Sequence, residues 1–360
     1  MKHSVVMAYQ GIAPEIGEGR QFFPGAAVIG QVWAGDRLTL RPFATLRGDG
    51  EEVHVGDDCW FGDRATMHIA DSEIPSTVRH NVSVGRYAVV HACTIDDWCV
   101  IGDAAVVMDA ATVGAGAVIA AEAFVPPRKT LEGGWLYEGS PAKPVRRVDK
   151  NELTRLREQL VKGDASSGVC SRELPSLDIR SLDSLAQGNG PLYELAGQSP
   201  ALHRETYVAP TATVAGKVSI SRDASVWFGT VMVGSGEGIQ LGERTNIQDN
   251  CLIEAGGKSV IFGCDVTIGH NVRIGECVVE DESLIGIGST IGKGAVIERG
   301  SCVAARALVM PGTIVKAGYI WAGRPAQKFR ALKTQEIDLF RQGKDAYIRY
   351  VRNYPRLVSR

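Results

Sequence analysis

Aliphatic residues recur at every sixth position in two separate stretches of the chain. The first stretch contains Ile101, Val107, Val113, Ile119 and Val125, and the second contains Ile285, Ile291, Ile297, Val303 and Val309. A six-residue period matches neither the turn of an α-helix nor the alternation of a single strand. The pattern instead predicts a solenoid, in which short strands and corners follow each other at a fixed spacing.

Many of these hexads share one order of residue types, as in residues 101–106 and 291–296. An aliphatic residue is followed by Gly or Asp, and a small residue comes three positions after that. The aliphatic side chain fills the interior, the small residue allows a tight corner, and Gly or Asp tolerates unusual corner dihedrals. Three hexads then make one coil of a triangular parallel β-helix, and each coil covers the edge of the next.

The two stretches align with a constant offset of 184 residues. The aligned pairs are Val84 with Ile268, Val90 with Ile274, Ile95 with Val279, and Ile101 with Ile285. A five-residue step interrupts the six-residue period at the same place in both stretches. Because an irregularity is shared as well as a period, the alignment predicts a tandem duplication.

A helical pattern follows each solenoid. Asp149 and Glu152 form a predicted capping box before Leu153, Leu156 and Leu160, and Thr334 is the predicted cap of a run with Ile337, Phe340, Tyr347 and Val351. Residues 163–198 lack the repeat and are polar and rich in breakers. We therefore predict an all-β solenoid with flanking α-helices. Residues 1–162 form a first β-helix with its helix, 163–198 a linker, and 199–360 a second β-helix with its helix.

Composition narrows the range of partners. The chain of 360 residues has a formal net charge of −2 and no long basic run, so a nucleic acid is not expected as a partner. The apolar part of its first residues is too short for the hydrophobic region of a signal peptide. No stretch approaches the roughly 20 apolar residues of a membrane span. We expect a cytoplasmic protein without a membrane partner. The eight cysteines form no CxxC pair and are expected to be reduced core thiols.

Possible metal ligands are divided between the two copies. In the first copy, Arg47-Gly48-Asp49 precedes His68 and then His91, and the copy ends in Tyr137-Glu138-Gly139-Ser140-Pro141-Ala142-Lys143. In the second copy, Thr245-Asn246-Ile247-Gln248-Asp249 precedes His270. Imidazole nitrogen is a common ligand of zinc in proteins. His54 and His80 of the first copy are expected to face solvent.

These motifs resemble the γ-class carbonic anhydrase family of the hexapeptide-repeat, left-handed β-helix superfamily, including its carnitine- and phenylacetate-operon relatives. That family has R-x-D, then T-N-I-Q-D-x-x-x-x-H, then V-x-I-G-H-x-x-x-x-H. Its three histidines bind zinc between adjacent subunits of a trimer, the first and third from one subunit and the second from its neighbour. The resemblance covers nearly everything outside residues 163–198.

The resemblance implies a composite zinc site between the two domains. The first copy keeps the first and third histidines, His68 and His91, and the second copy keeps only the second, His270. Zinc-bound hydroxide would hydrate CO₂ to bicarbonate, and iron or cobalt could replace zinc. The resemblance also implies that Arg47 and Asp49 of the first copy, and Asn246 and Gln248 of the second, support catalysis.

Several positions depart from the family pattern. Trp60 and Gly62 of the first copy replace the Asn and Gln of T-N-I-Q-D. If those polar groups must come from the subunit that supplies two ligands, the site binds zinc but hydrates CO₂ poorly. The missing histidines are replaced by Arg86 in the first copy and by Glu254 and Gly275 in the second. Arg86 and Glu254 are expected to form a bidentate ion pair in a metal-free counterpart of the site.

Two other functions stay open on the sequence. One is a non-catalytic structural or assembly protein of the same fold. The other is an acyl-CoA-dependent acyltransferase or thioesterase with His68 or His91 as a general base. In each case we expect a homo-oligomer built from trimers of β-helix domains, and for the lyase a small-molecule substrate, CO₂ or bicarbonate.

Overall fold

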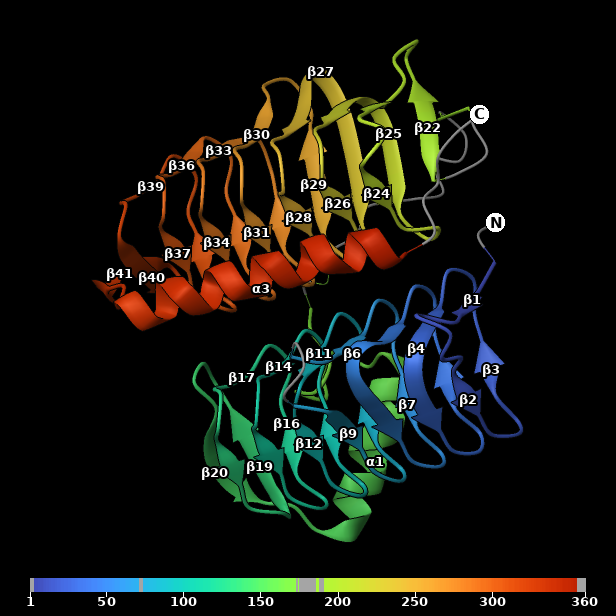
Figure 1. Cartoon of the computed structure of the whole chain (residues 1–360). Coiled ribbons are helices and arrows are strands. Elements are labelled where there is room, and N and C mark those ends of the chain that lie inside the picture. Colours follow the sequence, from blue (N-terminus) through green and yellow to red (C-terminus); the bar gives the residue numbers. More distant parts are fainter. Residues whose placement is uncertain (1–2, 71–73, 173, 175–185, 188–190, 355–360) are drawn as a thin grey trace. The chain divides into compact units, whose positions relative to one another are not determined.

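The computed structural model describes residues 3–70, 74–172, 174, 186–187 and 191–354 of the chain. The chain divides into two compact units, Met1–Pro175 and Ser176–Arg360. Each unit is a parallel β-solenoid that is followed by an α-helix, so the predicted fold class is confirmed (Figure 1). Three faces, here called A, B and C, form the sides of each solenoid.

The first unit builds its faces from twenty strands, and two long strands bend from face A to face B. Face A contains β1 (Val5–Met7), the first part of β4 (Ala27–Ala34) and of β6 (Thr45–Val55), β8 (Thr66–His68), β11 (Val89–His91), β14 (Val106–Val107) and β17 (Phe124–Val125). Face B contains β2 (Glu15–Ile16), the second parts of β4 and β6, β9 (Ser76–Val78), β12 (Thr94–Ile95), β15 (Thr112–Val113) and β18 (Thr130–Leu131). Face C contains β3 (Gln21–Phe22), β5 (Thr39–Leu40), β7 (Trp60–Phe61), β10 (Ser83–Val84), β13 (Val100–Ile101), β16 (Val118–Ile119), β19 (Trp135–Glu138) and the antiparallel β20 (Lys143–Arg147).

The second unit repeats this plan. Face A contains β21 (Ala186–Gln187), β22 (Leu192–Leu195), the first part of β25 (Thr213–Ile220) and of β27 (Val231–Leu241), β29 (Leu252–Ala255), β32 (Arg273–Ile274), β35 (Thr290–Ile291) and β38 (Leu308–Val309). Face B contains β23 (Ala201–Leu202), the second parts of β25 and β27, β30 (Val260–Phe262), β33 (Cys277–Val279), β36 (Ala295–Ile297) and β39 (Ile314–Val315). Face C contains β24 (Tyr207–Val208), β26 (Ser225–Val226), β28 (Asn246–Ile247), β31 (Thr267–Ile268), β34 (Leu284–Ile285), β37 (Cys302–Val303), β40 (Tyr319–Gly323) and the antiparallel β41 (Ala326–Ala331).

The repeated aliphatic residues lie inside the solenoids, as predicted. All ten residues of the six-residue series are buried. The role predicted for glycine at the corners needs a correction, because the positive φ falls on Ala104, two residues after Gly102. A Cβ on Gly102 would lie 2.5 Å from the backbone nitrogen of Ala121 in the next coil. Glycine therefore serves the close stacking of coils at this position.

Helices α1 (Lys150–Lys162) and α3 (Thr334–Asn353) follow the solenoids, and Figure 1 shows α3 running along the second one. Asp149 caps α1 as predicted, and its carboxylate accepts a hydrogen bond of 2.9 Å from the Glu152 amide. The prediction that Thr334 caps α3 is wrong. The cap is Lys333, and Thr334 is the first helical residue. The Lys333 amide donates instead to the Glu336 carboxylate, at 2.9 Å.

Part of the segment assigned to the linker packs on the first unit. Val169 and Cys170 are buried against Leu156 and Leu160 of α1 and against outward side chains of face C. The Asp103 amide donates to the Val169 carbonyl, at 2.8 Å. At the other end of the segment, β22 pairs with β25 of the second unit. Residues at both ends of the predicted linker therefore pack on, or pair with, one of the two units.

The cysteines behave as predicted. All eight are free, and seven are buried. Burial raises the pKa of Cys99, Cys277 and Cys302 to about 12, which leaves these thiols protonated and unreactive at neutral pH. Among the described residues, no helix has the length and apolarity needed to cross a membrane.

Candidate metal centre

His68 and His91 are neighbours on face A of the first unit. His68 ends β8 and His91 ends β11, and the two residues lie directly opposite each other in the parallel register. Each follows an inward aliphatic residue, so the alternation of the strand points both imidazoles outward. Their ring centroids are 5.5 Å apart. Arg47 of β6 is the next residue in the same column.

Asp49 connects Arg47 to His68. Its Oδ1 lies 3.0 Å from His68 Nε2, and its Oδ2 accepts a hydrogen bond from the Arg47 guanidinium. The side chains of Arg47 and Asp49 are buried. Arg47 and Asp49 of the R-x-D motif are therefore in direct contact. In this protein, the two residues pair with each other within one unit.

Asp109 contacts His91 from the corner that follows β14. His91 Nδ1 and Asp109 Oδ1 are 2.6 Å apart. Burial raises the pKa of the Asp109 carboxyl, but the charge and hydrogen bond of His91 outweigh it, so this pKa lies below its ordinary value. Asp109 was not predicted from the sequence. Its position one coil after His91, at a separation of 18 residues, is the signal that could have found it.

His270 and its neighbours form a second polar group, in the second unit. His270 follows β31 at the corner between faces C and A, and its Nδ1 lies 3.0 Å from Asp249 Oδ2 in the preceding coil. Gln248 donates from its amide to Asn246 Oδ1 at 3.3 Å, and Asn246 donates to Thr267 Oγ1 at 3.0 Å. The predicted residues Asn246 and Gln248 are thus hydrogen-bonded to each other next to the Asp249–His270 corner.

No family model matches the chain, but several known proteins are similar to it in sequence. Protein YrdA of Escherichia coli is 35% identical over 159 residues, which are 42% of this chain and 86% of YrdA. Gamma carbonic anhydrase 1, mitochondrial, of Arabidopsis thaliana is 38% identical over 163 residues, 43% of this chain and 59% of that protein. The chain belongs to the γ-class carbonic anhydrase-like family. It is a tandem form of that family's left-handed β-helix, because each match has about the length of one unit.

A solved structure gives a similar match. The hexapeptide transferase family protein of Anaplasma phagocytophilum is 38% identical to this chain, over 45% of this chain and 96% of that one, with a TM-score of 0.44. This chain spans only 59% of each of the first two Arabidopsis γ-carbonic anhydrases that it matches.

Trp60 and Gly62 of the first unit stand where the family motif has its polar pair. Trp60 packs against the apolar cluster under α1, which contains Leu156 and Leu160. A Cβ on Gly62 would lie 2.7 Å from the backbone nitrogen of Arg86. With this backbone, position 62 has no room for a glutamine.

Arg86 has a partner within the first unit. Its Nε lies 3.2 Å and 3.1 Å from the two carboxylate oxygens of Asp103, and its Nη2 contacts the same carboxylate. Burial lowers the pKa of Arg86, but the hydrogen bond and charge of Asp103 raise it above its ordinary value. Asp103 thus neutralises this guanidinium within the first unit. The predicted pair of Arg86 with Glu254 would join two units and stays a prediction. Glu254 lies on β29 and is exposed.

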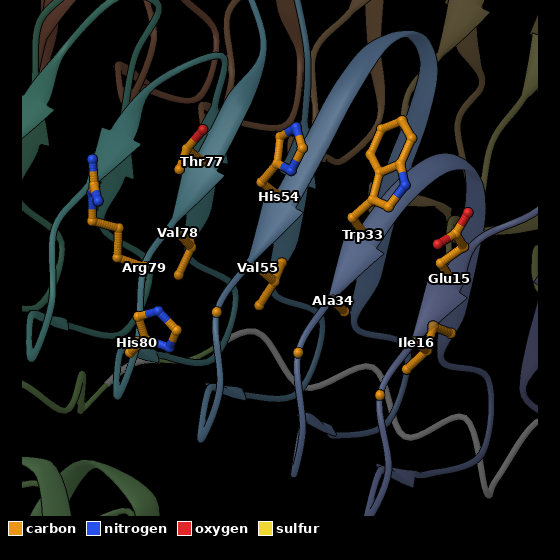
Figure 2. Close-up of a pocket in the computed structure, with 13 residues that line it drawn as sticks. Glu15, Ile16, Trp33, Ala34, His54, Val55, Thr77, Val78, Arg79 and His80 are labelled. Carbon is orange, nitrogen blue, oxygen red and sulfur yellow. The ribbon is translucent and has the colours of Figure 1, made fainter.

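The remaining predicted histidines, His54 and His80, face solvent as expected. Their side chains are 45% and 56% exposed. Both line a shallow pocket of about 600 Å³ on face B, where Trp33 stacks on His54 with ring centroids 5.1 Å apart (Figure 2). Because this pocket is built from β2, β4, β6 and β9, it is distinct from the pair of histidines on face A.

Proposed function

We propose that this protein is a metal-dependent lyase that hydrates CO₂. In this proposal, His68 and His91 of a first unit and His270 of a second unit hold one zinc ion. The observation that carries it is the register of His68 with His91, because it places two imidazoles on adjacent strands of one face. The family relationship to γ-class carbonic anhydrases supports the same reaction.

The donor set fits zinc. Three imidazoles are a ligand set of catalytic zinc sites, which keep a further position open. His68 and His91 each have a hydrogen bond between one ring nitrogen and a carboxylate oxygen, an arrangement that holds a ligating imidazole in one tautomer. His270 Nδ1 lies 3.0 Å from a carboxylate oxygen of Asp249. The third ligand has to come from a second unit, because a neighbouring first unit would present Arg86, paired with Asp103, at the position of the second histidine.

When bound, zinc lowers the pKa of a coordinated water to about 7, so that a hydroxide nucleophile forms at neutral pH. The chain's own residues would position the reactants. Gln248 donates its amide hydrogen to Asn246, so its carbonyl oxygen is the end that would accept a hydrogen bond from water or from bicarbonate. Arg47 and Asp49 would hold His68 in place.

The first test is the metal content of protein purified without added metal or chelator. We expect up to one zinc per chain by mass spectrometry, which also reports iron and cobalt. Protein that takes up no metal after zinc is supplied would overturn the proposal and favour the assembly or acyl-transfer reading. The mass of the assembly, by light scattering, tests the proposed homo-oligomer of trimeric β-helix groups. The eight free thiols support the cytoplasm as its compartment.

The second test is CO₂ hydration by stopped flow with Gln248→Ala. We expect kcat to fall by about 100-fold, the effect of removing one preorganised hydrogen-bonding group, while the zinc content stays unchanged. Gln240→Ala is the matched control, because Gln240 is an exposed glutamine on face B of the same unit. Equal activity of the two variants would remove Gln248 from the proposed site.

A further inference from the structure

Two of the three candidate ligands have been lost from the other copy together with their carboxylates. Lys293 stands at the position equivalent to Asp109 where Gly275 replaces His91. Ser235 stands at the position equivalent to Asp49 where Glu254 replaces His68, as the pairing of Val233 with Glu254 and of Arg47 with His68 shows. At these two positions, the carboxylate is present only in the copy that has the histidine. The third position differs, because Asp63 of the first copy is equivalent to Asp249 and is present although Arg86 replaces the histidine.

The replaced positions have been rebuilt around other contacts. Lys293 Nζ lies 3.9 Å from a carboxylate oxygen of Glu276, and its Cγ lies 3.0 Å from where a Cβ on Gly275 would be. The side chain of Lys293 therefore occupies the space beside Gly275. The solenoid keeps its register there, because β32 and β35 pair as the equivalent strands β11 and β14 do.

We propose that Asp109 is a positioning residue that sets the tautomer and the orientation of His91. In this arrangement, His91 donates its Nδ1 proton to Asp109, across the 2.6 Å contact, and presents Nε2 to a metal ion. A carboxylate behind a ligating imidazole also raises the basicity of that ligand. The inference rests on the proposed metal site and adds to it the residue that makes His91 a competent ligand.

A purely structural role for the Asp109–His91 contact is the alternative. The Asp109 side chain is 35% exposed, and a polar contact so close to the surface contributes little to folding. The second unit folds with Lys293 at the equivalent position, so the coil does not require an aspartate there. These observations favour a role in presenting His91 over a role in stability.

The experiment compares the zinc affinity of the full-length wild-type protein and its variants by competition with a chromophoric chelator. We expect Asp109→Ala to bind zinc about 10- to 100-fold more weakly, the usual effect of losing a partner behind a metal ligand. Asp109→Asn should keep most of the wild-type zinc affinity, since the amide oxygen of asparagine can still accept a hydrogen bond from His91 Nδ1. Lys293→Ala is the matched control and should bind zinc like the wild type.

A second readout separates this inference from the metal site itself. In metal-free protein, ¹⁵N NMR of the His91 ring should show the Nδ1-protonated tautomer. The Nε2-protonated tautomer in the wild type, or an unchanged zinc affinity in Asp109→Ala, would overturn the role of Asp109. A wild type that binds no zinc but shows the Nδ1-protonated tautomer would sink the proposed function and leave the orientation of His91 intact.

Discussion

The two units of this chain share their interior and differ on their surfaces. At the aligned positions Ile101 and Ile285, both units bury an isoleucine completely. The outward column of face B differs in every coil. It consists of Thr77, Thr94, Thr112 and Thr130 in the first unit, and of Ile261, Val278, Val296 and Ile314 in the second. Packing constrains the inward positions of a solenoid, so duplication left the outward positions free to diverge.

The same contrast holds at the candidate metal centre. All three histidines point outward or lie at a corner, and none is part of the aliphatic interior. Each unit could therefore lose some ligands without losing its fold. One unit kept two histidines with their carboxylates, and the other kept one histidine with the Asn246–Gln248 pair. The two units are alike in fold and differ in the candidate ligands that they carry.

The largest expected effect tests whether the two units share one site. We expect His91→Ala and His270→Ala each to weaken zinc binding by on the order of 1,000-fold, because each removes one of three ligands. Glu254→Ala, at the position equivalent to His68, should leave the zinc content unchanged. Zinc content is measured per chain by mass spectrometry. A zinc content equal to that of the wild type in either histidine variant would show that the two units do not share one site.

The next effect tests whether the interiors are equivalent. Ile101→Ala and Ile285→Ala should each lower the free energy of unfolding of the affected unit by about 2–5 kcal/mol, because each leaves a cavity in a packed core. Urea unfolding followed by circular dichroism measures the loss. A loss of unfolding free energy in only one variant would show that the two interiors are not equally well packed.

A smaller effect concerns an anchor that both units keep. Arg330 holds Glu336 at the start of α3, and Arg146 holds Glu152 at the start of α1, each through two hydrogen bonds. The hydrogen bond from Arg330 lowers the pKa of Glu336 from 4.5 to about 2. Because the folded-state pKa is depressed, the stabilisation is present above the ordinary pKa and is lost as the pH falls towards 2.

Glu336→Gln should therefore cost about 1 kcal/mol of unfolding free energy at pH 7, the upper range for a pair near the surface. The difference from the wild type should shrink as the pH is lowered through the range below 4.5, and Glu152→Gln should behave in the same way. Urea unfolding at a series of pH values measures this. A cost that does not change with pH would mean that the charge of Glu336 is not what matters.

The smallest effect is expected from exchanging the columns of face B. The double variant Val278→Thr, Val296→Thr and the reciprocal Thr94→Val, Thr112→Val should each change the unfolding free energy by less than about 1 kcal/mol, because threonine and valine both suit strands. Thermal unfolding measures the change. A larger loss of unfolding free energy in one unit would show that its face B column makes packing contacts that the other column lacks.

Much of the fold could be predicted because it depends on a local period. The recurrence of aliphatic residues and the offset of 184 residues identify the solenoids, and Asp149 identifies the start of α1. The start of α3 was missed by one residue, since the Lys333 amide donates its hydrogen bond to the Glu336 carboxylate and Thr334 is already helical. The packing of Val169 and Cys170 was missed because residues 163–172 carry no periodic signal.

The sequence by itself determined the coil, the duplication and the identity of the candidate ligands. Each of these follows from residue type and spacing along one chain. Only the tertiary structure decided which charged groups face one another: Asp49 with His68, Asp109 with His91, and Asp103 with Arg86. These partners lie 17 to 19 residues apart in neighbouring coils. The physical reason is that outward side chains meet when they lie about one coil apart along the chain. Many charged residues are separated by that number of residues, so the spacing alone does not select the pairs that form.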